Sequence, residues 1–506
     1  MPALLHSVWS IFLVVLFFGG SIFVHELGHF LAARRRGVHV ERFSIGFGPP
    51  IWSRRGRDGV EYWLAWFPFG GYVMLPQLAD LGSLEGPPRT VTAEPTTGYS
   101  IPFGAYAVLP KSDVPRGPDG RVDVSKLPPL SYPTKMIVFA AGAFFNLLFA
   151  FALASVVWAV GQPLSDEQAT TKIGYVAPTL DLATGKTAPS PAVEAGLRPG
   201  DTVVAVDGHK VSNWDDLRQS MVMSSGRDSR GDPLMTLTIE RDGRQFPVTV
   251  HPRIASYEKI RTIGISAWTP LEVVDFSGKD PLGRQAGFQP HDEIEALDGH
   301  PVGHLFAWLD YLEAHRGQPV AVQVRRAGQL HNLVVAPHGE TPANLMPLGV
   351  ELTTGYKTVH VPPWTQLDDE VVSTLRTLRS LLDPHSDIGL SKLSGPVGIV
   401  HLLLEGAGEP EFRSGLRAVI MLTILINVNL AVLNLLPVPI MDGGQMLMAT
   451  IARLRGRALP MEFVLRLQGV FVVLLLTMFV YVTVFNIRDW VHDNQLEQQM
   501  SAPARH

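Results

Sequence analysis

The chain of 506 residues contains no cysteine and few charged side chains. Without cysteine it cannot form disulfide bonds, thiolate zinc sites, iron–sulfur clusters or a cysteine nucleophile, so any metal site must use His, Asp or Glu. Charged residues make up 18% of the sequence, against about 25% in a typical soluble domain. The formal net charge of −5 leaves no basic footprint for nucleic acid, and we predict no nucleic-acid partner.

Charge is missing mainly from four long apolar runs. Each run is longer than the roughly 18–20 residues that a helix needs to cross a hydrocarbon core about 30 Å thick. The runs are residues 1–24, 136–165, 418–441 and 467–487. The first run lacks the basic start and the small-residue cleavage site of a secretory signal, so we expect it to be retained. We therefore predict a polytopic α-helical membrane protein with four transmembrane helices and a lipid bilayer around it.

Arginines beside these runs predict the orientation. They cluster at two places, namely Arg34, Arg35 and Arg36 after the first run, and Arg453, Arg455 and Arg457 between the third and fourth runs. Positively charged loops stay on the cytoplasmic side of a membrane. Both termini and the long segment of residues 166–417 are therefore expected on the outer side.

The long outer segment contains two similar stretches. Residues 195–201 (AGLRPGD) and 286–292 (AGFQPHD) each precede an alternating apolar strand that runs into an Asp-Gly turn, at Asp207 and Asp298. A short helix and a further strand follow in each copy, which predicts two α+β modules. Their order resembles the circularly permuted bacterial PDZ domain, a fold that binds extended chain termini at a sheet edge. Two unrelated α+β domains with shared turn chemistry are the alternative.

The residues that carry chemistry follow the first apolar run. His25 and His29 are one helical turn apart, so both imidazoles project from one face and can bind a single zinc ion. Glu26 lies beside them, where it can act as a general base for the attacking water. Polar residues that merely reach the membrane interface would give the same pattern. The cost of holding such residues at membrane depth favours a functional role.

A third ligand is expected near the end of the third apolar run. Pro437 and Pro439 break that helix, and Asp442 follows the break directly. Non-helical backbone at membrane depth is tolerated where it is buried in protein or lines a wet cavity. The predicted orientation brings Asp442 to the same cytoplasmic side as His25 and His29. Alternatively, Asp442 could simply cap the next helix, ahead of two glycines.

These motifs together resemble one known family. The chain is similar to the site-2 proteases, intramembrane zinc metalloproteases, of the bacterial regulator-of-sigma-E type with tandem PDZ domains. The resemblance covers nearly the whole chain and rests on HELGH (residues 25–29), ERFSIGFG (41–48), FGGYV (69–73), LSGPVGI (393–399) and NLLPVPIMDGG (434–444). It implies a zinc metalloendopeptidase with Zn²⁺ bound by His25, His29 and Asp442, and with Glu26 as the catalytic base.

The resemblance also implies a setting and a substrate class. It predicts a multi-pass protein of the inner membrane with its active site near the cytoplasmic face. The expected substrates are single-pass membrane proteins, of the anti-sigma-factor or remnant-signal-peptide type, cut in or near the transmembrane helix. The PDZ pair is expected to exclude substrates with bulky outer domains and to bind peptide or protein termini in its grooves. Residues 40–74 correspond to a membrane-associated β-hairpin region that presents an edge strand to the substrate.

Three asparagines in the apolar runs are further candidates. Asn429 and Asn434 match positions that the family pattern associates with substrate contact or transition-state support, although helix packing explains each equally well. Asn146 occupies the place of the family's AGPxxN motif, but Ala143 replaces the proline. For Asn146 we expect a packing role.

The predicted fold class is therefore a four-helix membrane protein with two extracytoplasmic α+β PDZ-like domains and a membrane-associated β-hairpin region. The predicted parts are residues 1–78 (first helix, zinc motif and β region), 79–132 (Pro/Gly-rich cytoplasmic insert), 133–165 (second helix), 166–255 and 256–340 (the two PDZ-like domains), 341–415 (connector with amphipathic helices), 416–460 (third helix and Asp-Gly motif) and 461–506 (fourth helix and tail). Within the connector, residues 366–401 are expected to be helical, either as an interfacial gate or as a plain linker.

Two other functions fit parts of the pattern. An inactive membrane scaffold carrying PDZ modules is disfavoured because every residue that the chemistry needs is present. A transporter is disfavoured because the four runs contain none of the repeated, inverted spans typical of transport sites.

Overall fold

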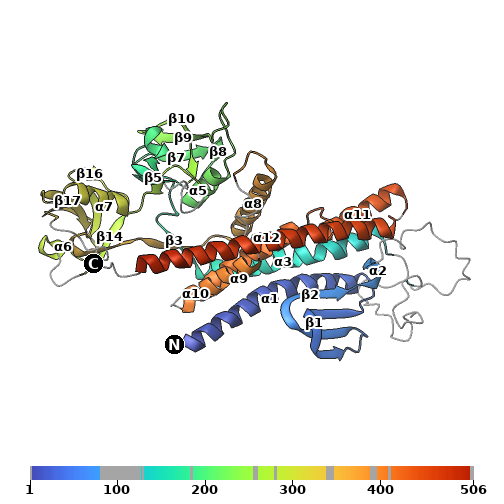
Figure 1. Ribbon diagram of the computed structural model, residues 1–506. Coiled ribbons are helices and arrows are strands. Elements are labelled where there is room, and N and C mark those ends of the chain that lie inside the picture. Colours follow the sequence, from blue (N-terminus) through green and yellow to red (C-terminus); the bar gives the residue numbers. More distant parts are fainter. Residues whose placement is uncertain are drawn as a thin grey trace, which may run out of the picture. The chain divides into compact units, whose positions relative to one another are not determined.

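A computed structural model of the protein describes residues 3–79, 127, 130–182, 186–254, 260–277, 282–337, 347–387, 396–407, 412–457 and 459–501. The chain divides into two compact units (Figure 1). Unit 1 comprises Met1–Val160, Val361–Leu375 and Leu390–His506, and unit 2 comprises Gly161–His360 and Arg376–Gly389. Most of the predicted insert of residues 79–132 lies outside the described residues.

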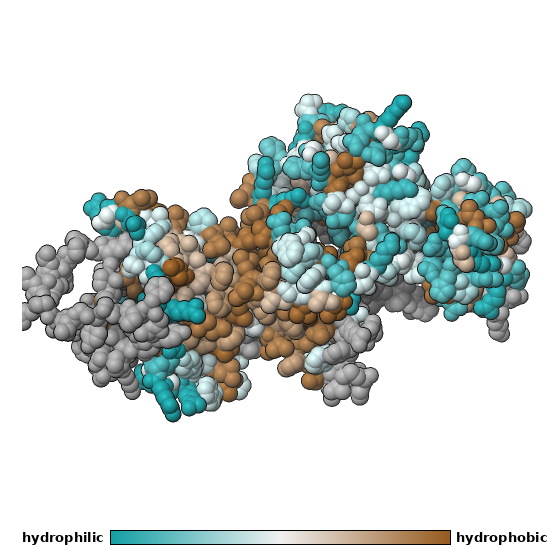
Figure 2. All heavy atoms as spheres, turned by 180° about the vertical axis from the view of Figure 1, so that it is seen from behind, coloured by the Kyte–Doolittle hydropathy of each residue, from teal (hydrophilic) through white to brown (hydrophobic). Residues whose placement is uncertain are grey.

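Unit 1 is built on long apolar helices. Its main helices are α1 (Ala3–Arg35), α3 (Tyr132–Val160), α10 (Phe412–Asn434) and α12 (Met461–Ser501). Among the described residues, four helical stretches are long and apolar enough to cross a membrane, namely Val8–Arg35, Tyr132–Val160, Ser414–Asn434 and Glu462–Val484. The four apolar runs therefore form four helices that are candidates for membrane spans, as predicted. Figure 2 shows hydrophobic side chains gathered over these helices, whereas the surface of unit 2 is mainly hydrophilic.

Three of these helices, α1, α3 and α10, pack against one another. Gly28 of α1 lies against the backbone of α3, where a Cβ on this glycine would be only 2.4 Å from the carbonyl oxygen of Ala141. Small residues allow two membrane helices to approach closely enough for their backbones to touch. The contact brings the turn of α1 that contains His25 and His29 directly against α3.

A β-hairpin packs on the end of α1. It consists of β1 (Arg42–Arg55) and β2 (Glu61–Met74), which pair antiparallel, and the short helix α2 (Pro76–Ala79) follows it. The first residues of β1 pair with both ends of β2, because Phe43 is opposite Val73 on one side and Tyr62 on the other. Phe43 is buried against Phe30 of α1. The expected β-hairpin region is therefore present and lies next to the His-bearing helix.

The expected helical stretch of residues 366–401 is two separate helices, α8 (Pro363–Leu382) and α9 (Pro396–Ala407). The first ends at Leu382 because Pro384 disfavours helical backbone at Asp383. Residues 388–395 lie outside the described part of the chain. Pro437 and Pro439 end α10 at Asn434 in the same way, and α11 (Asp442–Arg455) begins after the turn.

Unit 2 contains two strand-rich modules. In module 1 the sheet order is β10-β9-β7-β8, and in module 2 it is β18-β17-β15-β14-β19 with β16 paired to β15. The elements of module 1 are β4 (Ile173–Val176), β5 (Thr179–Asp181), β6 (Thr187–Pro189), α4 (Pro191–Glu194), β7 (Thr202–Val206), β8 (His209–Lys210), α5 (Trp214–Met223), β9 (Met235–Arg241), β10 (Arg244–Val250), β11 (Arg253–Ile254), β12 (Arg261–Thr262) and β13 (Ile265–Ala267).

The elements of module 2 are β14 (Leu271–Phe276), α6 (Leu282–Gln285), β15 (Glu293–Leu297), β16 (His300–Pro301), α7 (Leu305–Ala314), β17 (Val320–Arg326), β18 (Gln329–Val335), the 3₁₀ turn η2 (Pro347–Gly349) and β19 (Val350–Thr354). In addition, β3 (Gln162–Ser165) pairs with β20 (Tyr356–Val359). Each module has its own apolar core, around Leu217 in module 1 and around Trp308 in module 2.

The modules extend beyond the boundaries that the sequence predicts. Ile263 and Ala267 belong to the core of module 1, although we expected it to end at residue 255. The strand β19 pairs with β14 in the sheet of module 2, although we expected that module to end at residue 340. The strand β13 is only three residues long, too short for alternation to be recognised.

Candidate metal centre

Two histidines of α1 face each other across one helical turn. The Nε2 atoms of His25 and His29 are 3.2 Å apart. The Nδ1 atom of His29 lies 2.8 Å from the backbone carbonyl oxygen of Val138 in α3. Nδ1–H of His29 therefore donates to this oxygen, which leaves the lone pair of Nε2 available for a metal.

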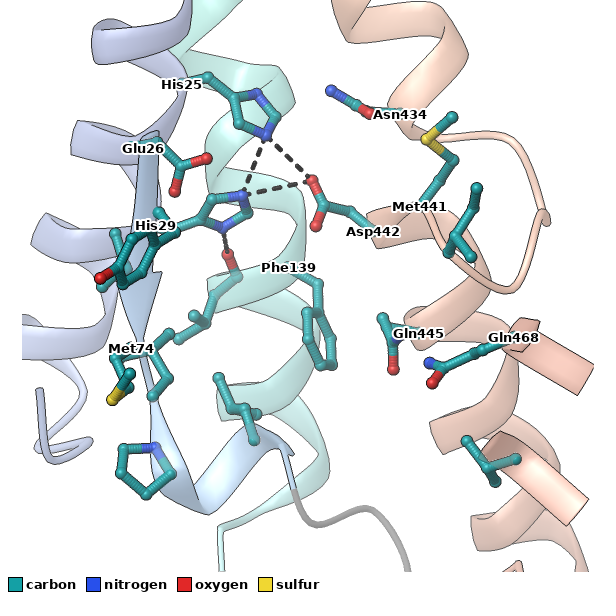
Figure 3. A pocket seen from close by; sticks show the side chains of 18 of the residues that line it. His25, Glu26, His29, Met74, Phe139, Asn434, Met441, Asp442, Gln445 and Gln468 are labelled. Carbon is teal, nitrogen blue, oxygen red and sulfur yellow. Dashed lines mark hydrogen bonds and ion pairs between the residues drawn. The ribbon is translucent and has the colours of Figure 1, made fainter. Parts of the chain in front are cut away.

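Asp442 completes the group from a distant part of the sequence. Its Oδ2 atom is 3.4 Å from Nε2 of His25 and 3.3 Å from Nε2 of His29. Asp442 is the first residue of α11, but the N-cap of that helix is Met441 and no side chain caps it. The carboxylate thus points to the histidines and does not cap the helix, as Figure 3 shows.

The three donor atoms fit a zinc ion. Ligand atoms about 2.0–2.1 Å from zinc at tetrahedral corners are about 3.3–3.4 Å from one another, and the three observed separations are 3.2, 3.3 and 3.4 Å. Oδ2 of Asp442 is buried and has no hydrogen-bond partner among the residues that the structure describes. A buried carboxylate oxygen without a donor is costly, and a divalent cation between these three atoms would satisfy it. In the described ranges, His25, His29 and Asp442 form the one such group that could hold a metal.

The donor atoms open onto a cavity of about 590 Å³ within unit 1. Glu26 lines it from the same side of α1 as the two imidazoles (Figure 3). Gly71 of β2 makes room for Glu26, because a Cβ at this glycine would be 3.3 Å from Cγ of Glu26. Tyr72, Val73 and Met74 of β2 also line the cavity. A carboxylate, the candidate metal ligands and a strand edge therefore share one space large enough for several residues of an extended peptide.

The two candidate asparagines of α10 lie in different places. Asn434 lines the cavity on the Asp442 side. Asn429 is not among the residues that line it, and its Oδ1 accepts a hydrogen bond from the hydroxyl of Thr374 in α8. The position of Asn429 thus favours the helix-packing interpretation, whereas Asn434 remains a candidate for substrate contact.

Two glutamines line the cavity that were not predicted from the sequence. The side-chain amides of Gln445 and Gln468 both donate to the carbonyl oxygen of Pro439, at 3.1 and 3.3 Å. They tie α11 and α12 to the turn that precedes Asp442. Gln468 is a polar residue at the start of the fourth apolar run, and that position is the signal that could have revealed it.

The fold and the site together define a class of protein. The chain has four helices able to cross a membrane, and it holds two histidines and an aspartate beside a glutamate at one cavity. These are the features of a membrane-embedded zinc metalloendopeptidase.

The chain belongs to peptidase family M50, whose pattern it matches over residues 12–478. It is 29% identical over 509 residues to the regulator of sigma-E protease RseP of Salmonella typhimurium strain 14028s, covering 94% of this chain and 98% of the relative. To the protein of the same name from Escherichia coli K12 it is 27% identical over 500 residues, with the same coverage. The name of a Vibrio cholerae relative, 28% identical over 483 residues (90% of this chain and 92% of the relative), refers to a zinc metalloprotease.

Proposed function

We propose that this protease cleaves peptide bonds in or near the transmembrane helix of single-pass membrane proteins, as a step of regulated intramembrane proteolysis. The observation that best supports the proposal is the trio of His25 Nε2, His29 Nε2 and Asp442 Oδ2, within 3.4 Å of one another beside Glu26. Because His25, Glu26 and His29 lie in α1, a helix of membrane-spanning character, the substrate is a chain that reaches membrane depth.

His25, His29 and Asp442 would hold the metal. When bound, zinc supplies Lewis-acid chemistry, polarising the scissile carbonyl and making water a better nucleophile near neutral pH. Glu26 takes a proton from the attacking water and returns it to the leaving amine. Asn434, on the Asp442 side of the cavity, is placed to donate an amide hydrogen to the carbonyl oxygen as it gains negative charge.

The substrate helix has to unwind before it can be cut, because helical amides are already hydrogen-bonded to one another. We infer that the cavity-facing part of β2, Tyr72 to Met74, stabilises the unwound segment by adding it as a strand. On one side these residues pair with β1, and no further described strand pairs with their other edge. The exposed Trp52, Trp66 and Phe67 of the hairpin suit a membrane interface.

The two modules of unit 2 are proposed to be PDZ-like domains outside the inner membrane. Both modules contain the same ion pair, in which a buried aspartate after the AGL or AGF turn accepts two hydrogen bonds from one arginine. The pairs are Asp201 with Arg241 and Asp292 with Arg326. Such modules would bind chain termini and exclude substrates whose outer domain is still bulky. The arginine clusters favour an active site near the cytoplasmic face and both termini outside. The names of the relatives favour an anti-sigma factor as substrate, with remnant signal peptides as the alternative.

Glu26→Gln tests the proposal. The purified enzyme and the variant are incubated in detergent with a single-span model substrate. We expect cleavage to fall by about 10²–10⁴-fold, the usual contribution of a general acid–base group, while zinc content stays that of the parent. Glu462→Gln, at an exposed position of α12, is the matched control and should cleave normally. Equal cleavage by parent and Glu26→Gln, or no cleavage by a parent that carries one zinc, would refute the assignment.

A further inference from the structure

One face of α3 lies along the two histidines. Val138, Gly142 and Asn146 are spaced four residues apart, so they form a single stripe on the helix. The carbonyl oxygen of Val138 faces Nδ1 of His29 at 2.8 Å, as the lower dashed line in Figure 3 marks. At the other end of the stripe, the side-chain amide of Asn146 lies 3.3 Å from Nδ1 of His25.

Gly142 lies between these two contacts and allows them to coexist. A Cβ at this position would be 2.4 Å from Nε2 of His29 and 2.6 Å from Cε1 of His25. Both distances are shorter than any real Cβ contact, so only glycine lets both rings rest against α3.

Asn146 is fully buried, and its Oδ1 has no hydrogen-bond partner within the described part of the chain. A buried amide oxygen without a donor costs on the order of 1–3 kcal/mol. A half-turn of the amide group would place Oδ1, instead of Nδ2, against Nδ1 of His25, since the two ends of the amide have nearly the same shape. In that orientation Nδ1–H of His25 donates to Oδ1 of Asn146, Nδ2 of Asn146 takes the former place of Oδ1, and the lone pair of His25 Nε2 faces Asp442.

We propose that Asn146 is a positioning residue of the metal site, whose Oδ1 fixes the tautomer and the ring orientation of His25 as the Val138 carbonyl does for His29. The inference rests on the proposed metal-binding role of His25, His29 and Asp442. It replaces the packing role that the sequence suggested for Asn146. An apolar side chain would pack in this place without leaving a buried oxygen unpaired, so packing alone gives no reason for an asparagine.

Zinc affinity distinguishes the two roles without any measurement of activity. We would measure the zinc dissociation constant of the full-length protein in detergent by competition with a chromophoric chelator. Asn146→Leu removes the acceptor, and loss of such an outer partner weakens metal binding by about 10–100-fold. Asn146→Asp keeps an acceptor at the same distance, and its affinity should stay within about threefold of the parent or increase. The spectrum of the Co²⁺-substituted protein should change in the Leu variant only.

The matched control is Asn427→Leu. Asn427 is also fully buried, and its Oδ1 likewise has no partner among the described residues. Its amide donates to Ser21 and to the carbonyl of Thr423, and not to an imidazole. Its replacement should leave zinc affinity unchanged. Parent-like zinc binding by Asn146→Leu would overturn the proposal, as would equal weakening by Asn146→Leu and Asn146→Asp. A parent that binds zinc but cleaves nothing would refute the proposed function alone, whereas a parent that binds no zinc would overturn both.

Discussion

Aspartates with buried carboxylate oxygens occur in both units, and they are held in opposite ways. In module 2, Asp292 is fully buried, and its two oxygens accept from the guanidinium of Arg326 at 2.7 and 2.8 Å and from the backbone N–H of Gln289 at 2.8 Å. Asp201 in module 1 has the same partners in Arg241 and Arg198. In unit 1, Asp442 turns a buried oxygen toward two imidazole nitrogens, and no described residue donates a hydrogen bond to it.

This difference in hydrogen bonding distinguishes carboxylates that stabilise the fold from a carboxylate that is available to bind a ligand. The module aspartates have their charge neutralised and their hydrogen bonds complete, so they hold the turn after the AGL or AGF stretch and can bind nothing else. Oδ2 of Asp442 lacks a hydrogen-bond donor among the described residues, and a bound cation would compensate the cost of burying it. Replacing Asp442 should therefore weaken metal binding, whereas disrupting the ion pair of a module aspartate should lower the stability of that module.

The largest effect is expected for Asp442→Asn. A neutral amide is a far poorer zinc ligand than a carboxylate, so zinc affinity should fall by more than about 100-fold and cleavage should reach background. Metal content after gel filtration, measured by atomic absorption, checks the change. The control variant Asp201→Asn, which changes the buried aspartate of module 1, should have the zinc content of the parent. An Asp442→Asn variant that retains one zinc per chain would show that the third ligand lies elsewhere.

A smaller effect, on stability alone, is expected for Arg326→Met. Removing the arginine leaves Asp292 buried and short of donors, which should destabilise module 2 by about 2 kcal/mol. Breaking a fully buried ion pair costs about 3–5 kcal/mol, and the cost is expected to be smaller here because Arg326 is partly exposed. Hydrogen exchange of β15 and β17 measures the loss, and zinc content should not change. Adding Asp292→Asn should restore part of the stability, and no restoration would argue against an unpaired charge as the cause.

The smallest effect concerns Asp387, which is only partly buried and pairs with Arg261 and Arg227. Burial acts to raise the pKa of this carboxyl, but the two guanidiniums together lower its pKa below the usual value. A lowered pKa stabilises the folded state above the unfolded pKa of about 3.9, and this contribution is lost as the pH falls through the folded pKa. Hydrogen exchange near residues 376–387 should therefore accelerate below about pH 4. In Asp387→Asn this acid-dependent change should be absent, and a variant that kept it would exclude Asp387 as the titrating group.

Local patterns in the sequence predicted a large part of this protein. Four apolar runs predicted the membrane helices, and His25 and His29 could be paired because one helical turn separates them. Asp442 was expected from a proline break, since disrupted backbone at membrane depth needs a reason. In each case the signal lies within a few residues of the feature, which is what a single sequence can reveal.

Features that depend on distant contacts could not be predicted in this way. Asn146 was expected to pack, because nothing near it in the sequence indicates that its partner is His25, on another helix. Gly142 carries no local sign that two rings rest against it. The ends of the modules were missed because β13 and β19 join their partners across long connections. The roles of Asn434 and of the hairpin remain predictions.

The carbonyl oxygen of Pro439 receives two amides, one from Gln445 on the helix that begins with Asp442 and one from Gln468 on α12. The two bonds restrain the same turn independently. If α12 moved aside to admit a substrate, the bond from Gln468 would break, yet the bond from Gln445 would still hold the turn. The turn that carries Asp442 is therefore held from within its own helix, so its position does not depend on α12 alone.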